Sequence, residues 1–192
     1  CILSVYRRKL VESIITYPQP IPMSYKNKTY VAFDGDTDIA YYRIMQAWKS
    51  NDDIDFNFYD AHDINSARDT SAEESIKSQL RIRMANAKQM ILLVGENTKY
   101  LKKFVPWEIE LARKKDIPII VVNLNNKKVF DDDLCPSAVK DWIYTINIPF
   151  KMKIIKYALD NFPDNYENRK NDSEYMSHKY HYKDSVYEEL GL

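Results

Sequence analysis

QMILLVGENTKYLKKFVPWEIELARKKDIPIIVVNL, residues 89–124, is the stretch that decides the fold. Residues 90–94 and 117–122 are continuous apolar runs, which are typical of interior parallel strands covered on both faces. Between them lie a glycine-containing turn and a helix that is opened by Pro106. The stretch predicts half of an open α/β sheet and sets Glu108 in the first turn of its helix. Because such sheets bind ligands at the carboxyl ends of their strands, Glu108 stands where chemistry is expected.

The same alternation of apolar strands and amphipathic helices continues on both sides of this stretch. Five alternating strands predict an α/β fold, a flavodoxin-like doubly wound parallel sheet with the strand order 2-1-3-4-5. Residues 34–38 and 95–98 then leave the sheet side by side, at the switch point between strands 1 and 3. The remaining strands are expected at 29–34, 54–59 and 142–146, and the remaining helices at 37–50, at 149–161 and from Thr70 or Ser71 onward.

Three segments of different composition divide the chain. Residues 1–22 form an N-terminal appendage, because the closely spaced prolines at its end stop regular structure. Residues 23–162 form the α/β domain. Residues 163–192 are a tyrosine-rich C-terminal extension, with five tyrosines among many charges. Since that aromatic content is high for a disordered tail, we expect the extension to wrap over the domain or over a partner chain.

The composition excludes several functional classes. Lysine and arginine together number 28, as do aspartate and glutamate, so the basic excess typical of a nucleic-acid-binding face is missing. The chain has three glycines, too few for a glycine-rich phosphate loop of the P-loop or dinucleotide type. It has two cysteines and lacks an apolar run of the roughly 18 residues that a membrane span needs, which predicts a cytoplasmic protein. We expect neither a nucleic-acid partner nor a membrane partner.

Glu108 has two interpretations. If Pro106 is the first helical residue, Glu108 is the third, where a carboxylate favours the helix dipole and bonds back to the cap. Spacing alone favours this capping role, because first-turn acids are common. In the functional interpretation, the carboxylate projects into a cleft beside Trp107. It would then stabilise the positive charge that develops on a sugar carbon as a glycosidic bond breaks.

Three acidic residues, Asp34, Asp36 and Asp38, alternate through the expected exit of the first strand. Turn chemistry explains them as one N-cap (Asp36 or Thr37), one first-turn acid and one loop acid. The alternative is a Mg²⁺ site, since that cation prefers carboxylate oxygens. We favour the turn interpretation and expect no metal site.

Polar and aromatic side chains follow the expected third strand. Asn97 and Thr98 leave it towards the cleft, where either is suited to bond a ribose hydroxyl or a phosphate; both are also ordinary turn residues. Phe104 and Trp107 either stack on a flat ring or cover the edge of the sheet, which is the more common role.

Two motifs carry a resemblance to a known family. The run VAFDGDTD, residues 31–38, precedes a succession of VGENT, WEIE and PIIVV. Together they resemble the TIR-like domains of bacteria, most closely the branch that includes the TIR-like proteins of the Thoeris antiphage system. The resemblance extends from about residue 30 to residue 162 and leaves out the appendage and the extension.

This resemblance implies a flavodoxin-like TIR fold and an enzyme of defence signalling. TIR enzymes cleave the nicotinamide–ribose bond of NAD or make cyclic ADP-ribose-type messengers, so NAD is implied as a substrate and no cofactor is needed. Glu108 in WEIE occupies the place of their catalytic glutamate. Phe33, Asp34, Asn97 and Trp107 would line the pocket. The resemblance further implies self-association into a homo-oligomer and a downstream effector protein that reads the messenger.

The exit of the first strand departs from the family pattern. It reads FDGDTD, where many TIR domains carry a Ser-rich or basic exit suited to phosphate. Three carboxylates there repel a pyrophosphate unless Arg43, Arg68 or a cation offsets them. The alternative function is therefore a non-catalytic TIR-like adaptor, in which Glu108 merely caps its helix.

Two other functions of the same fold are disfavoured by missing residues. A phospho-acceptor receiver needs an aspartate at the end of strand 3, where Gly95 and Glu96 stand, and a lysine after strand 5, where Asn147 stands. A flavodoxin needs a Ser/Thr/Gly phosphate loop after strand 1, which this exit does not supply.

Overall fold

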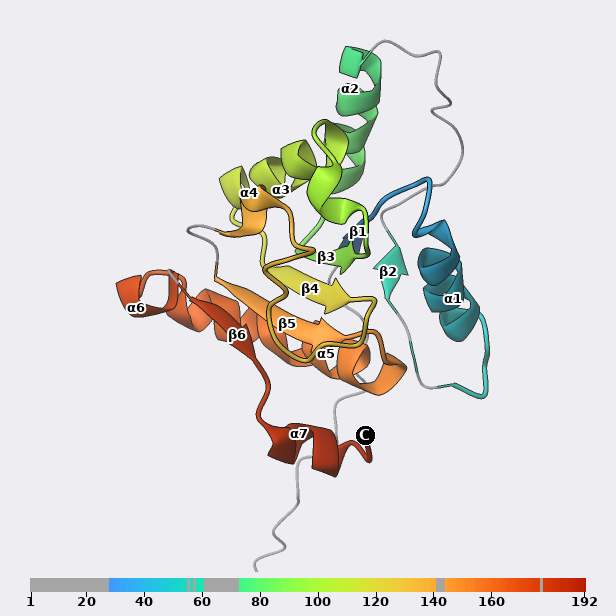
Figure 1. Ribbon diagram of the computed structural model, residues 1–192, viewed down its shortest axis with the longest axis vertical. Coiled ribbons are helices and arrows are strands. Elements are labelled where there is room, and N and C mark those ends of the chain that lie inside the picture. Colours follow the sequence, from blue (N-terminus) through green and yellow to red (C-terminus); the bar gives the residue numbers. More distant parts are fainter. Residues whose placement is uncertain (1–27, 55, 57, 61–72, 141–143, 177) are drawn as a thin grey trace, which may run out of the picture.

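A computed structural model describes residues 28–54, 56, 58–60, 73–140, 144–176 and 178–192 of the 192-residue chain (Figure 1). The predicted N-terminal appendage, residues 1–22, lies outside the described residues, and so do residues 61–69, which follow the expected second strand. The two positions offered as the start of the second helix, Thr70 and Ser71, also lie outside them.

Six strands of the described chain form one all-parallel sheet in the order β2-β1-β3-β4-β5-β6. This confirms the α/β flavodoxin-like fold, and the first five strands follow the predicted order. The expectation of a five-stranded sheet is corrected by β6, which comes from the C-terminal extension and pairs with β5. The strands are β1 (Lys28–Ala32), β2 (Tyr59–Asp60), β3 (Gln89–Val94), β4 (Ile119–Asn123), β5 (Thr145–Pro149) and β6 (Lys179–His181).

Helices cover both faces of this sheet, with α2, α3 and α4 on one side of the strands in Figure 1 and α5 on the other. The strands β3 and β4 are buried along their whole length, as their continuous apolar sequences predict. The helices are α1 (Ile39–Lys49), α2 (Glu73–Met84), the 3-10 turn η1 (Thr98–Tyr100), α3 (Phe104–Lys114), α4 (Ser137–Lys140), α5 (Met152–Arg169), α6 (Ser173–Met176) and α7 (Asp184–Glu189).

Successive residues of each strand enter two different cores, because side chains alternate between the faces of a sheet. Val31, Ile91 and Ile120 lie in register on one face and pack with α1, α5 and α7. Tyr30 and Met90 lie on the other face and pack with α2, α3 and α4. Neighbouring residues of β1, such as Tyr30 and Val31, therefore contact helices on opposite sides of the sheet.

The C-terminal extension is integrated into the domain by several contacts. The helix α5 continues through Pro163 to Arg169, so the predicted boundary between residues 162 and 163 falls within a helix. The Asn147 amide donates to the backbone carbonyl of Tyr180 in β6 at 3.0 Å. Beyond β6, α7 packs Tyr187 into the same core as α5. The extension thus adds both a strand and core side chains.

Among the described residues, no helix is both long enough and apolar enough to span a membrane.

Candidate functional site

A cleft of about 320 Å³ lies at the carboxyl ends of β1, β3 and β4, the edge where open α/β sheets bind ligands. Three loops build it, one after each of these strands. Its volume is within the range of small-molecule sites. The residues that line it are Thr37, Asp38, Tyr41, Gly95, Glu96, Asn97, Leu124, Asn125 and Leu134.

The loop between β1 and α1 is organised by the buried side chain of Asp34. Its carboxylate accepts hydrogen bonds from the backbone N–H of Asp36 and from the Thr37 hydroxyl, both at 3.0 Å. These are the bonds of a local turn, as the turn interpretation of the three acids predicts. The predicted N-cap is wrong in position, because Asp38 precedes the first residue of α1. The described residues contain no group of three or more His, Cys, Asp or Glu side chains that is arranged to hold a metal ion.

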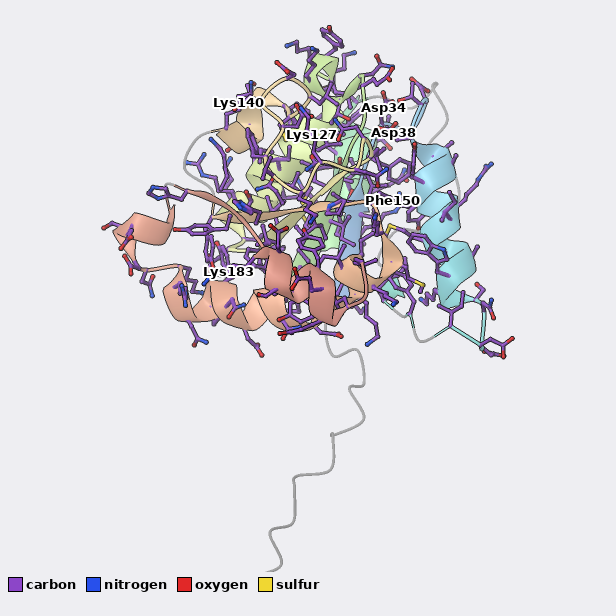
Figure 2. All side chains as sticks on the ribbon, turned by 60° about the horizontal axis from the view of Figure 1, so that its bottom comes forward. Asp34, Asp38, Lys127, Lys140, Phe150 and Lys183 are labelled. Atoms are coloured by element: carbon purple, nitrogen blue, oxygen red, sulfur yellow. The ribbon has the colours of Figure 1, made fainter. Side chains whose placement is uncertain are left out.

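Asp38 is buried beside the loop that follows β3, with a relative exposure of 5%. Its Oδ1 accepts a hydrogen bond from the Thr37 hydroxyl at 3.2 Å, whereas its Oδ2 has no hydrogen-bond partner among the described residues. Burial raises the pKa of this carboxyl, and the Thr37 and Thr98 hydroxyls partly offset that shift. Figure 2 shows Asp34 and Asp38 at the beginning of α1.

Gly95 permits the close approach of Asp38. A Cβ atom at position 95 would lie 2.5 Å from Asp38 Oδ1 and 2.6 Å from Oδ2, closer than van der Waals contact allows. The Gly95 N–H also donates to the Thr98 hydroxyl at 2.9 Å, which closes the turn into η1. Any larger residue here would have to displace the Asp38 carboxylate from its position beside the exits of β1 and β3.

Glu108 lies outside this cleft, in the core between the sheet and the helices α2 and α3. The helix α3 begins at Phe104, so Glu108 is its fifth residue, and the expectation of a first-turn position is wrong. Its carboxylate accepts a hydrogen bond from the hydroxyl of Tyr30 on β1. Burial raises its pKa to about 7, while the Tyr30 hydrogen bond and the nearby Arg83 charge act in the opposite direction. Only 5% of the residue is exposed.

A family model decides the identity of the chain. The model of the Thoeris protein ThsB, TIR-like domain, matches residues 30–129, which is more than half of the 192 residues. The chain belongs to this family. The match confirms the resemblance to bacterial TIR-like domains and makes the chain a TIR-like protein of defence signalling. Tyr30, Glu108 and most of the cleft lie inside the matched region.

The TIR-like domain does not gather all of its predicted site residues in one place. Asn97 lines the cleft, and Asp34 is buried in the turn beside it. Phe33 stacks on Tyr42, with ring centroids 4.9 Å apart, on the α1 side of the sheet. Trp107 packs on the α2 side, under the Arg81 guanidinium at 5.2 Å. Phe33 and Trp107 are thus separated by the sheet, and their roles at a substrate stay predictions.

Three residues of the TIR-like domain acquire their importance only in the structure. Tyr30 contacts Glu108 across 78 positions of sequence. Asp38 has a buried oxygen without a hydrogen-bond partner among the described residues, and Asn125 forms part of the cleft wall. The sequence held one signal, the scarcity of glycine, which made Gly95 directly after a buried strand unusual.

Proposed function

We propose that this TIR-like domain cleaves the nicotinamide–ribose bond of NAD and that Glu108 is the carboxylate that acts on the ribose. The observation that carries the proposal is the burial of an acid that no longer serves as a helix cap. Burying a carboxylate costs stability, and strongly shifted carboxyl groups are concentrated at functional sites. The structural position of Glu108, away from the first turn of α3, therefore favours a functional role over capping.

The chemistry assigned to Glu108 is electrostatic. When the bond from the ribose C1′ to the nicotinamide nitrogen breaks, its electron pair leaves with neutral nicotinamide and positive charge develops on the ribose. An ionised carboxylate beside C1′ stabilises that charge. Water then adds to C1′ and releases a proton, or a hydroxyl of the same molecule adds and closes a ring. Tyr30 holds Oε1, so we assign Oε2 to the substrate.

Access to Glu108 connects this chemistry to assembly. Because the residue is 5% exposed, substrate reaches it only when the surrounding side chains move. We infer that self-association of the domain supplies this opening, and that the product is read by a separate effector protein. Nicotinamide release per chain should accordingly rise with protein concentration. Activity that is strictly proportional to concentration over a hundredfold range would argue against control by assembly.

A second candidate function is a non-catalytic adaptor that acts through self-association. The observation that favours it is the hydrogen bond from Tyr30, which already occupies the Glu108 carboxyl within the core. In an adaptor the Tyr30–Glu108 pair only joins β1 to α3. Release of nicotinamide from NAD by concentrated purified protein, resolved by mass, separates the two candidates.

Tyr30→Phe is expected to move the pH–rate profile of NAD cleavage to higher pH. The Tyr30 hydrogen bond lowers the pKa of Glu108, so its removal raises that pKa further above about 7. The ionised form that stabilises the ribosyl cation then appears only at higher pH. The measurement is the rate of nicotinamide release across a pH series. The matched control is Tyr42→Phe, which removes a buried hydroxyl on the other face of the sheet and should leave the midpoint unchanged.

The stability of the protein is expected to fall as pH rises from the usual carboxyl range to about 7. In this window the folded state keeps the Glu108 proton, because burial raises its pKa from 4.5 to about 7, whereas the unfolded chain has lost it. This stabilising contribution is fully present below the pKa of Glu108 in the unfolded chain, and it is lost as the pH rises to the pKa of Glu108 in the folded protein. Between about pH 5 and about pH 8 the loss amounts to about 3 kcal/mol.

Urea denaturation of wild type and Glu108→Gln at the two pH values isolates this contribution, because all other groups titrate alike in both proteins. The wild type should lose the additional stability at the higher pH, and the variant should not. Equal losses in both proteins would show that Glu108 is ionised throughout, with an ordinary pKa.

A further inference from the structure

The cleft at the ends of β1, β3 and β4 carries a binding feature that the chemistry of Glu108 does not use. Asp38 lines the cleft and is 95% buried, and its Oδ2 is buried without a hydrogen-bond partner among the described residues. A buried acceptor without a partner costs free energy, so a ligand that donates to it gains both a bond and the relief of that cost.

The remaining walls of the cleft define what such a ligand looks like. Its lining, as the structure describes it, includes the carboxyl groups of Asp38 and Glu96 and no lysine, arginine or histidine. Lys127, on the loop after β4 (Figure 2), is engaged in an ion pair with Asp131 at 2.8 Å. A phosphate entering the cleft would meet two carboxyl groups and, among the described lining residues, no compensating base, which is unfavourable. The favoured ligand is uncharged or cationic.

The apolar part of the lining faces the same space. Tyr41, Leu124 and Leu134 supply aromatic and aliphatic surface beside the Asp38 carboxyl. Asn125 is held rigidly, because its amide donates to Asp131 at 2.7 Å and its carbonyl oxygen accepts the Lys127 N–H at 3.2 Å. The cleft therefore combines an apolar wall, suited to a flat ring, with a fixed amide and an acceptor for hydroxyl groups.

We propose that this cleft binds a nucleoside without a phosphate, with the neighbouring hydroxyl groups of the ribose donating to Asp38 and the base packing against Tyr41 and Leu134. A carboxylate that accepts from ribose hydroxyls at the end of a parallel strand is a general device of α/β folds. The site is distinct from Glu108, which does not line the cleft, and it does not depend on NAD cleavage.

Calorimetric titration of the wild-type protein tests the proposal directly. The probes are adenosine, guanosine, cytidine and uridine, followed by the 5′-monophosphate and the 2′,3′-dideoxy form of whichever binds best. One nucleoside should bind, and both altered forms should bind at least about tenfold more weakly, the first through repulsion and the second through loss of the donors. Absence of binding by all four nucleosides, or equal binding of the monophosphate, would overturn the proposal.

Two variants place the nucleoside in the cleft. Asp38→Asn replaces the charged acceptor by an amide, and Gly95→Ala displaces the same carboxylate by the contact described above. Each should weaken binding about tenfold or more. Asp36→Asn is the matched control, because Asp36 is exposed in the same turn and does not line the cleft. Unchanged affinity in Asp38→Asn and Gly95→Ala, or binding of Mg²⁺ alone that requires Asp38, would refute the nucleoside site.

The same titration separates this proposal from the proposed function. Nucleoside binding needs no turnover, and it should persist in Glu108→Gln, whose carboxyl is not part of the cleft. Binding without NAD cleavage would leave the cleft assigned and the enzyme refuted. NAD cleavage without nucleoside binding would support the enzyme and refute the nucleoside site in the cleft.

Discussion

Glu108→Gln is expected to reduce nicotinamide release from NAD by about 100-fold or more. Glutamine preserves the size of the side chain, and its amide oxygen still accepts the hydrogen bond that Tyr30 now donates to the carboxylate. What it removes is the negative charge that stabilises the ribosyl cation. The loss should therefore appear in the maximal rate, with little change in the concentration of NAD that gives half of it.

The assay is incubation of concentrated purified protein with NAD, with the products resolved by mass. Glu110→Gln is the matched control, because Glu110 is two residues farther along α3 and faces Arg113 near the surface, at 3.4 Å. It should retain full activity. Equal turnover in wild type and Glu108→Gln would remove Glu108 from the chemistry. No turnover in either protein, even when the chains are forced to associate, would favour the adaptor.

Stability of the same pair of proteins gives an independent argument. A buried carboxyl that is ionised above about pH 7 opposes folding there, and Glu108→Gln should be the more stable protein under those conditions. If Glu108 served packing alone, Glu108→Gln would instead be less stable than wild type. A variant that gains stability while it loses activity is the usual signature of a functional residue.

The fold was predictable because its central strands are encoded locally. The runs that form β3 and β4 are apolar without interruption, and such runs are stable only between two layers of helices. The rules of right-handed crossover and short connection then leave few orders for the strands. The strand β6 escaped prediction because its three residues, Lys179–His181, are polar and partly exposed and carry no apolar run.

Element ends were less predictable: the second strand, expected at 54–59, comprises only Tyr59–Asp60, and two further errors involve proline. We expected Pro106 to open α3, yet α3 begins at Phe104, because none of the first N–H groups of a helix needs an intrahelical partner. We expected Pro149 to open the last helix, yet it ends β5, at a position where a strand can lose a donor. Because of the error at Pro106, the sequence predicted Glu108 in the first turn of α3, whereas the structure places it in the core.

The candidate site was less predictable than the fold because its contacts are not local. The hydrogen bond between Tyr30 and Glu108 depends on how α3 is rotated about its axis. The spacing of apolar residues in the sequence does not determine that rotation to within one residue. The approach of Asp38 to Gly95 joins two loops that the sheet brings together. The cleft lies at the edge of the sheet where the sequence predicts ligand binding, and one of the four predicted substrate-binding residues, Asn97, lines it.

Tyr187→Ala is expected to lower the free energy of unfolding by about 4 kcal/mol, as truncation of a large buried aromatic residue does. Tyr187 is 1% exposed, although it lies only a few residues from the end of the sequence. Its ring packs in the core beside α5, and the Lys128 ammonium lies 4.3 Å from the ring centroid. Val186 and Leu190 of the same segment pack against that core and would lose their anchor with it.

Tyr187→Phe separates packing from hydrogen bonding at this position. The Tyr187 hydroxyl is buried and has no hydrogen-bond partner among the described residues, so its removal should leave stability unchanged or raise it slightly. Urea denaturation of the two variants beside wild type measures both effects. A loss below about 1 kcal/mol in Tyr187→Ala would mean that α7 opens independently of the sheet. A loss near the expected value would make the extension part of the cooperative unit that holds β5, and with it the edge of the sheet that β6 now covers.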